Sequence, residues 1–326
     1  MLRLEVRPYR REFQRSLTTR HGNWVTREGA VVRLTDAASR VGWGEIAPLP
    51  WFGTETLAAA LAYCAKLGNV VDAAAIATIP DTLPACQFGL GSALNALQHR
   101  PAAPWTPSPD QVCGLLPAGE AAIAAWPALW IKGHHTLKWK IGVQSIAQEQ
   151  AILMQVLKAL PATGRLRLDA NGGLTLAEAK QWLAILAPWN PHIEFLEQPL
   201  PPNQLMDLID LARRSPIPIA LDESIATVAQ FAQLDAQCPR QMVFVVKPAI
   251  AGHPDRLQAQ LCQTRRPVVF SSALETPIGR SAALALARWS WDHGIPPRPL
   301  GFGVEHWFAD RWNSLSPDAL WTHLAL

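Results

Sequence analysis

Three acidic residues stand at the carboxyl ends of successive apolar runs, where they can act together on one ligand. Asp169 ends RLRLD, Glu197 ends IEFLE and Asp222 follows PIAL, each about one strand and one helix from the next. Carboxylate oxygens without histidine or thiolate form a hard ligand set, which suits Mg²⁺, with Mn²⁺ as a substitute, rather than zinc or copper. A single acidic residue at a strand end often caps the following helix, but three in succession favour a metal site.

Lysines end two further apolar runs of the same series. Lys138 and Lys140 alternate in TLKWK and therefore share a face, and Lys247 ends FVVK. A nearby dication and a partly desolvated setting disfavour an ammonium ion, which predicts a lysine pKa lowered toward the range of a base. Metal and lysines together suit removal of a proton next to a carboxylate. The alternative left open is that Lys138 and Lys247 only neutralise the carboxylates.

Strands and helices alternate along the part of the chain that carries these groups. Helix-like segments such as 145–160 and 175–188 separate short apolar strand candidates, which are 112–116, 136–142, 165–172, 193–199, 218–224, 244–250 and 268–275. An open sheet would spread the charged strand ends along an edge, whereas a barrel brings them into one ring at its top face. We therefore predict an α/β fold with a (β/α) barrel.

The first hundred residues have a different pattern. LRLEV and AVVRL predict antiparallel strands, and the alanine-rich stretches 54–68 and 85–97 predict helices. FGLGSALNAL within the second stretch has a partial glycine signature, which we attribute to helix packing rather than to a dinucleotide site. The proline-rich passage 100–110 breaks regular structure, so we place an α+β domain at 1–105 and the barrel at 106–304.

Composition excludes several classes of function. Hydrophobic residues make up 49% of the 326 residues, which fills a large core and excludes global disorder. The net charge of +3 is too small for a nucleic-acid footprint, and we interpret the arginines at positions 3 to 20 as a solvated strand face.

Membrane and extracellular roles are not expected either. The apolar run 121–131 is too short to span a bilayer, and the amino terminus has no apolar signal region. Five scattered cysteines predict reduced thiols, so we expect a cytoplasmic protein.

The motifs in this order resemble the muconate-lactonizing subgroup of the enolase superfamily. The resemblance rests on K-W-K at 138–140, LDAN at 168–171, EQP at 197–199, DES at 222–224 and VVKPA at 245–249. It implies a modified (β/α)₇β TIM-type barrel under an α+β capping domain, to which the tail at about 305–326 adds. It also implies that Asp169, Glu197 and Asp222 hold Mg²⁺, with Lys140 as the base and Lys247 opposite.

Within this subgroup the chain is most similar to the o-succinylbenzoate synthases. TTRHG at 18–22 resembles their lid loop, and SSALET at 271–276, followed by Gly279, resembles their carboxylate-binding stretch. The resemblance implies a lyase that dehydrates a small succinyl-hydroxycyclohexadiene carboxylate on the route to menaquinone or phylloquinone. This resemblance, together with the side-chain alternation that points strand residues into the barrel, predicts seven substrate-binding residues. They are Lys138, Arg167, Asn171, Ser271, Ser272, Gly279 and Arg20.

Other functions remain open at this point. For Arg167, a structural ion pair with an acidic residue in the ring is an equal alternative. A dipeptide epimerase or an N-succinylamino acid racemase would use the same barrel and both Lys140 and Lys247, although RPLGFGVEHW has no D-x-D pair to hold a dipeptide amine. A non-catalytic barrel would turn over none of these substrates. The oligomeric state is left open, and a monomer is compatible with the sequence.

Overall fold

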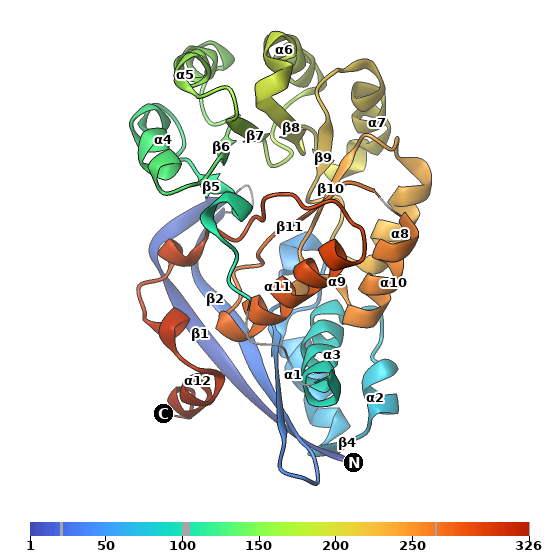
Figure 1. The fold of residues 1–326 in the computed structure, drawn as a ribbon. Helices are drawn as coiled ribbons and strands as arrows, with labels where there is room; N and C mark the ends of the chain where they lie inside the picture. The colour runs from blue at the N-terminus through green and yellow to red at the C-terminus, as the bar shows by residue number, and fades with distance from the viewer. Residues whose placement is uncertain (20–21, 100–104, 265, 326) are drawn as a thin grey trace.

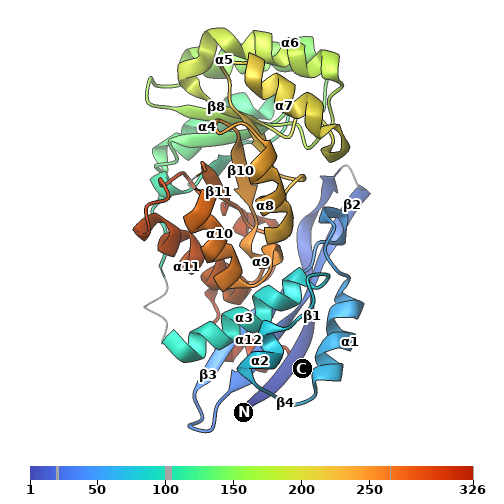
Figure 2. The same ribbon diagram turned by 90° about the vertical axis from the view of Figure 1, so that its right-hand side faces the viewer.

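Two separate sheets organise the chain (Figure 1). The computed structural model describes residues 1–19, 22–99, 105–264 and 266–325. In Figures 1 and 2, α5 and α6 lie at one end of the molecule, whereas α1, α2, β4 and both chain termini lie at the other. The first sheet with its helices is called the cap below, and the second with its helices the barrel.

The barrel sheet has seven parallel strands in chain order, as the alternating pattern predicts. They are β5 (Gly114–Leu115), β6 (Thr136–Lys140), β7 (Arg165–Asp169), β8 (Ile193–Glu197), β9 (Ile219–Leu221), β10 (Val243–Val246) and β11 (Val268–Phe270). Leu300 pairs with Val112 beside β5, and Gly301 pairs with Ser271 beside β11. This short eighth segment joins the two edges of the sheet, so the (β/α)₇β prediction is confirmed.

Helices surround this sheet. They are α4 (Ala121–Ile131), α5 (Ile146–Ala159), α6 (Leu176–Leu186), α7 (Leu205–Arg214), α8 (Val228–Gln237), α9 (Pro248–Ala251), α10 (Pro254–Thr264) and α11 (Pro277–Asp292). Capping boxes begin α5, α6 and α8, with Ser145, Thr175 and Thr227 as the N-cap residues. Phe195, Val245 and Val269 belong to a separate apolar cluster on strands β8, β10 and β11, and residues of this kind fill the barrel interior.

The barrel strands end earlier than the predicted segments, and for β10 the cause is a proline. We expected a strand over 244–250, but β10 ends at Val246 and α9 begins at Pro248. Proline cannot donate to a strand ladder and favours the first position of a helix, so the chain turns directly after Lys247. This turn leaves Lys247 as the N-cap residue of α9, at the end of the strand.

The cap sheet is antiparallel, with the strand order β3-β2-β1-β4. Its elements are β1 (Leu2–Thr19), β2 (Gly22–Thr35), β3 (Val41–Ile46), α1 (Leu57–Leu67), β4 (Val70–Val71), α2 (Ala73–Ala77) and α3 (Pro84–His99). A Cβ on Gly44 of β3 would overlap the carbonyl of Gly89 on α3. Within FGLGSALNAL, Gly89 permits close packing of α3 on the sheet and Gly91 permits close packing on Pro254, so the glycines serve helix packing as predicted.

The carboxyl-terminal segment packs against the cap strands. Trp321 of α12 (Pro317–His323) joins a buried cluster with Tyr9, and Arg11 pairs with Asp310. The Arg11 guanidinium lies 3.6 Å from the ring centre of Phe308 and is 1% exposed, so the predicted solvated strand face is wrong for this arginine. The exact domain boundaries at 105 and 305 stay predictions.

Two further properties bear on the sequence predictions. All five cysteines are unpaired, as their scattered spacing predicts. Among the described residues, no helix combines the length and the apolar character needed to cross a bilayer.

Candidate active site

Five charged residues are brought to one end of the barrel by the ends of consecutive strands. Lys140, Asp169 and Glu197 are the last residues of β6, β7 and β8, and they are in register with one another. Asp222 directly follows β9, and Lys247 directly follows β10. Because β6 and β10 lie four strands apart in a closed barrel, the two lysines stand on opposite sides of the carboxylates.

Lys138 lies between two of the carboxylates. Its Nζ is 2.8 Å from Asp169 Oδ2 and 2.9 Å from Glu197 Oε1. Burial alone would lower the pKa of Lys138, but the charges of Asp169, Glu197 and Asp222 outweigh it and raise this pKa well above its ordinary value. The protein charges alone thus act against the predicted lowering at Lys138, whose contacts are those of a neutralising charge. The effect of a bound dication on a lysine pKa stays a prediction.

The two remaining lysines differ in their contacts. The ammonium group of Lys247 donates to Asp222 Oδ1 and lies 4.2 Å from the ring centre of Phe52, which comes from the cap. Lys140 is half-buried, and among the described residues its ammonium group makes no ion pair. Lys140 is therefore the lysine of the ring that is least committed to a protein partner.

Burial and mutual repulsion act on the carboxylates of the ring. Burial first, and then repulsion from Asp169 and Asp222, raise the pKa of Glu197 to about 8, although Lys138 opposes this shift. Among the described residues, no three or more histidine, cysteine, aspartate or glutamate side chains are close enough together to form a metal-ligand cluster. Lysine ammonium groups contact the carboxylates of the ring instead. Three buried carboxylates are nevertheless a hard oxygen donor set that fits Mg²⁺.

Two residues of the quoted motifs hold the strand ends in left-handed backbone conformations. Asn171 has φ of 45°, and it donates through its backbone N–H to Asp169 Oδ1 (2.9 Å) and through Nδ2 to Glu223 Oε1 (3.1 Å). Gln198 has φ of 36° and is fully buried. Its Oε1 accepts from the backbone N–H of Asp222 (3.0 Å), and its Nε2 donates to Ser224 Oγ (2.9 Å). The motif EQP contains Gln198, yet only its glutamate was singled out from the sequence.

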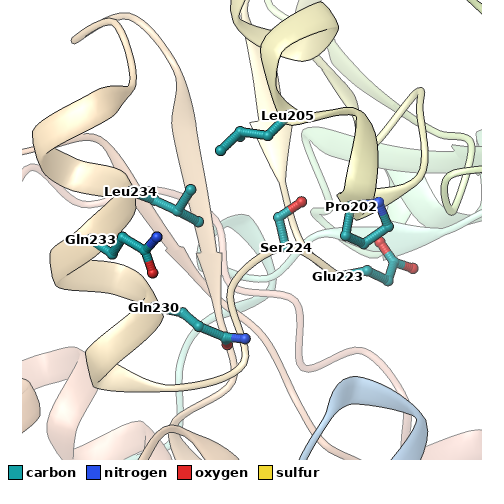
Figure 3. A pocket seen from close by; sticks show the side chains of 7 residues that line it. All are labelled: Pro202, Leu205, Glu223, Ser224, Gln230, Gln233 and Leu234. Carbon is teal, nitrogen blue, oxygen red and sulfur yellow. The ribbon is translucent and has the colours of Figure 1, made fainter.

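A pocket of about 430 Å³ opens where the cap meets this ring. Trp51, Phe52 and Gly53 line it from the cap, and Asn171 and Glu223 line it from the barrel. A neighbouring hollow lies between α7 and α8 and shares Glu223 (Figure 3); it is lined by Pro202, Leu205, Glu223, Ser224, Gln230, Gln233 and Leu234. The first pocket is the candidate substrate site, because two of its lining residues contact the ring: Phe52 lies against Lys247, and Asn171 donates to Asp169.

Glu223 was not singled out from the sequence, although it stands inside DES. Burial first, and then the charges of Asp222 and Asp169, raise the pKa of Glu223 to about 7. Its Oε2 is buried without a hydrogen-bond partner. Adjacency to Asp222 was the only available signal, and whether Glu223 faces the pocket depends on the turn after β9.

Arg167 is placed in the barrel interior rather than in the pocket. Its guanidinium is 2% exposed and donates to both carboxylate oxygens of Glu194, at 2.7 and 3.2 Å. The register of β7 and β8 shifts beside Glu194, and Arg298 donates to the same carboxylate. This network corrects the predicted substrate-binding role of Arg167, because its contacts are those of the structural alternative.

We expect Arg167→Met to destabilise the protein far more than it changes substrate binding. Removing the buried partner leaves Glu194 with only the more exposed Arg298, at a cost of about 3 kcal/mol in the free energy of unfolding, measured by urea denaturation. Arg298→Met is the control, because Arg298 is more exposed and its loss leaves Arg167 on Glu194. Unchanged stability together with a large rise in KM for Arg167→Met would restore its substrate-binding role.

Several polar groups of the predicted carboxylate-binding stretch already have hydrogen-bond partners within the protein. Ser271 is half-buried, and its Oγ lies 3.4 Å from the carbonyl oxygen of Gly301. Ser272 Oγ donates to Glu275 Oε2 at 3.0 Å. The Gly279 N–H donates to the buried cap carboxylate of Glu45 at 2.9 Å, and a Cβ there would lie 2.7 Å from Glu45 Oε2.

Gly279 is therefore committed to the contact between cap and barrel, which corrects its predicted substrate-binding role. Arg20, the last predicted substrate-binding residue, lies outside the described residues. The catalytic roles of Lys140 and Lys247 and the metal-binding role of the carboxylates stay predictions.

Known families match both parts of the chain. Residues 1–97 match the family described as MenC, N-terminal domain, and residues 121–296 match the family described as enolase C-terminal domain-like. These two matches cover the cap and most of the barrel.

Individual relatives agree with these matches. The o-succinylbenzoate synthase of Thermosynechococcus vestitus is 43% identical over 310 residues, which is 94% of each chain. A crystal structure of o-succinylbenzoate synthase from Thermosynechococcus elongatus, complexed with magnesium in its active site, has a TM-score of 0.90 and 40% identity, and the match covers 98% of this chain and 99% of that one. The L-Ala-D/L-Glu epimerase of Bacillus subtilis, with a TM-score of 0.73, 20% identity and coverage of 94% and 91%, shares the fold. The chain described here thus belongs to the o-succinylbenzoate synthase family of the enolase superfamily.

Proposed function

We propose that this protein is a Mg²⁺-dependent o-succinylbenzoate synthase. It would dehydrate 2-succinyl-6-hydroxy-2,4-cyclohexadiene-1-carboxylate to o-succinylbenzoate, on the route to menaquinone or phylloquinone. The observation that carries the proposal is the ring of two opposed lysines around three buried carboxylates, in a chain 43% identical to an o-succinylbenzoate synthase over nearly its whole length.

In this proposal the residues of the ring have separate roles. Asp169, Glu197 and Asp222 hold the metal, and Lys138 balances part of their charge. Bound Mg²⁺ supplies positive charge that stabilises the oxygen atoms of the substrate carboxylate as an adjacent C–H bond breaks. The substrate occupies the pocket lined by Phe52 and Asn171, two residues that contact Lys247 and Asp169 of the ring.

Lys140 carries the proton in this reaction. Its neutral Nζ takes the proton from the carbon that bears the ring carboxylate, and the electron pair of that C–H bond forms the new ring double bond. The C–O bond to the hydroxyl group on the next carbon breaks, and the Lys140 ammonium returns the proton so that water leaves. The ring becomes aromatic, which makes the elimination strongly downhill.

Lys247 acts as a fixed cation on the opposite side. Its contacts with Asp222 and the Phe52 ring hold the ammonium group in place, which suits a stabilising charge over the planar intermediate. A racemase needs a second lysine that exchanges protons freely, and this ion pair disfavours that function for Lys247.

One assay tests the proposal. Purified protein with Mg²⁺ is mixed with the hydroxycyclohexadiene substrate, and the loss of diene absorbance is followed, with EDTA-treated protein as the control. We expect turnover that requires the metal. An unchanged diene, together with proton exchange on N-succinylamino acids, would show a racemase instead. A small-molecule carboxylate substrate and a cytoplasmic location belong to the same proposal.

A further inference from the structure

A single arginine of the cap contacts two segments that lie far apart in the sequence: the cap segment that leads into the pocket lining and the barrel loop after β11. Arg27, on β2, is 2% exposed, and its guanidinium donates four hydrogen bonds to backbone carbonyl oxygens. One of these, Glu28, is its chain neighbour, at 2.6 Å. The other three carbonyl oxygens belong to segments that are distant in the sequence.

Two of these bonds hold the cap side of the pocket. Nη2 donates to the carbonyl of Ala47 at 2.6 Å, and Nη1 donates to that of Pro48 at 2.9 Å. Directly after them the chain forms the 3₁₀ turn η1 (Pro50–Phe52), which places Trp51 and Phe52 in the pocket lining. The turn also holds the Phe52 ring against Lys247.

Aromatic contacts reinforce this connection. The Arg27 guanidinium lies 5.7 Å from the ring centre of Trp24. Trp24 in turn packs edge-on against Trp51, with ring centres 4.5 Å apart. Arg27 is thus linked to the pocket wall through its backbone and through a side chain.

The remaining bond holds the barrel side. Nε donates to the carbonyl of Ala273 at 3.1 Å, in the loop between β11 and α11. This loop follows Ser271 and Ser272 directly, and it contains Leu274 with φ of 61°, a conformation that costs free energy unless its surroundings hold it. Within the loop, Glu275 accepts from Ser272 Oγ and from the Ala273 N–H (2.6 Å).

The positive charge of the Arg27 guanidinium is buried in an unusual environment. Among the described residues, no carboxylate forms an ion pair with Arg27, so the buried cation is stabilised by carbonyl dipoles and by the ring of Trp24. Burying a charge without a counter-ion costs free energy, so Arg27 is poorly suited to a role in stability alone. Its planar guanidinium has donors in fixed directions, which suits it to hold two segments at a fixed distance.

We propose that Arg27 is a positioning residue for substrate binding: it sets the distance between the cap segment 47–53 and the barrel loop 271–276. The inference rests on the proposed function, because it assigns these two segments to opposite borders of the same substrate. Lysine at this position keeps the charge but cannot span carbonyls on both segments, so the two borders separate while the ring of Lys140 and the carboxylates is untouched.

The test compares Arg27→Lys with Arg11→Lys. Arg11 is an equally buried cap arginine, but its partners, Asp310 and Asn313, lie in the carboxyl-terminal segment and not at the pocket. Both variants should lower the melting temperature. Arg27→Lys should raise KM for the diene substrate about 10-fold and change kcat less than about 3-fold, because ground-state and transition-state binding weaken together. Arg11→Lys should leave KM within about 2-fold of the wild-type value.

Hydrogen–deuterium exchange gives a readout that does not depend on turnover. In Arg27→Lys, amides of both 47–53 and 271–279 should exchange faster, while those of β7 and β8 stay as in the wild type. Arg27→Gln serves if Arg27→Lys does not fold. Equal KM values for the Arg27 and Arg11 variants, or faster exchange in only one of the two segments, would overturn the inference. An inactive wild-type protein would instead refute the proposed function and leave the exchange experiment to decide the coupling.

Discussion

Replacing Lys140 with alanine should lower kcat/KM about 10³- to 10⁴-fold, because a positioned general base is lost. The same change should alter the free energy of unfolding by less than about 1 kcal/mol, since the half-buried side chain makes no ion pair among the described residues. Steady-state kinetics with the diene substrate and urea denaturation measure the two quantities. A large loss of activity without loss of stability would assign the proton transfer to this lysine.

A matched control distinguishes this role from a general effect of charge. Lys158→Ala removes an exposed lysine from α5, the helix that follows the same strand, and should leave kcat/KM unchanged. Magnesium should still stabilise Lys140→Ala, because the three carboxylates are intact. Retention of activity in Lys140→Ala would refute its role as the base and direct attention to Lys247.

Replacing Glu197 with glutamine should remove both activity and magnesium-dependent stability. In the wild type, Mg²⁺ at about 100 times its Kd should add about 2.7 kcal/mol to the free energy of unfolding, and this increment should disappear in the variant. We expect kcat to fall at least about 10³-fold, because charge stabilisation of the reacting carboxylate is lost. Thermal unfolding with and without Mg²⁺ measures the increment independently of turnover.

Without metal, the free energy of unfolding of Glu197→Gln should not be lower than that of the wild type. Burial and the neighbouring carboxylates already raise the pKa of Glu197 to about 8, so a neutral amide of the same shape relieves repulsion from Asp169 and Asp222. Glu178→Gln is the control, because glutamine at this capping-box position of α6 keeps the reciprocal hydrogen bonds. An Mg²⁺ increment of wild-type size in Glu197→Gln would exclude Glu197 as a ligand.

Local patterns predicted the part of the site that depends on strand periodicity. Side chains alternate along a strand, so a charged residue at the end of an apolar run points to a defined face of the sheet and lies at a defined level along the barrel axis. Parallel strands joined by helices then bring such ends together, which is how Lys140, Asp169 and Glu197 come into register. Short apolar runs predicted the barrel strands, and alanine-rich stretches predicted two helices of the cap.

Contacts between distant segments decided the remainder. Arg167 shares the face of Asp169, but a shift in register beside Glu194 supplies its partner inside the barrel. Gly279 stands in a motif that resembles a carboxylate-binding stretch, yet Glu45 of the cap takes its N–H. Arg27 joins two segments that no local pattern connects.

By itself, then, the sequence determined the fold class, the ring of charged strand ends and the family to which they belong, because each depends on residue type and short-range spacing. Only the tertiary structure decided which polar groups remain free for a ligand. A hydrogen-bond donor is available to substrate only when no nearer partner takes it, and for Arg167, Gly279 and Arg27 the nearer partner comes from a segment far away in the chain.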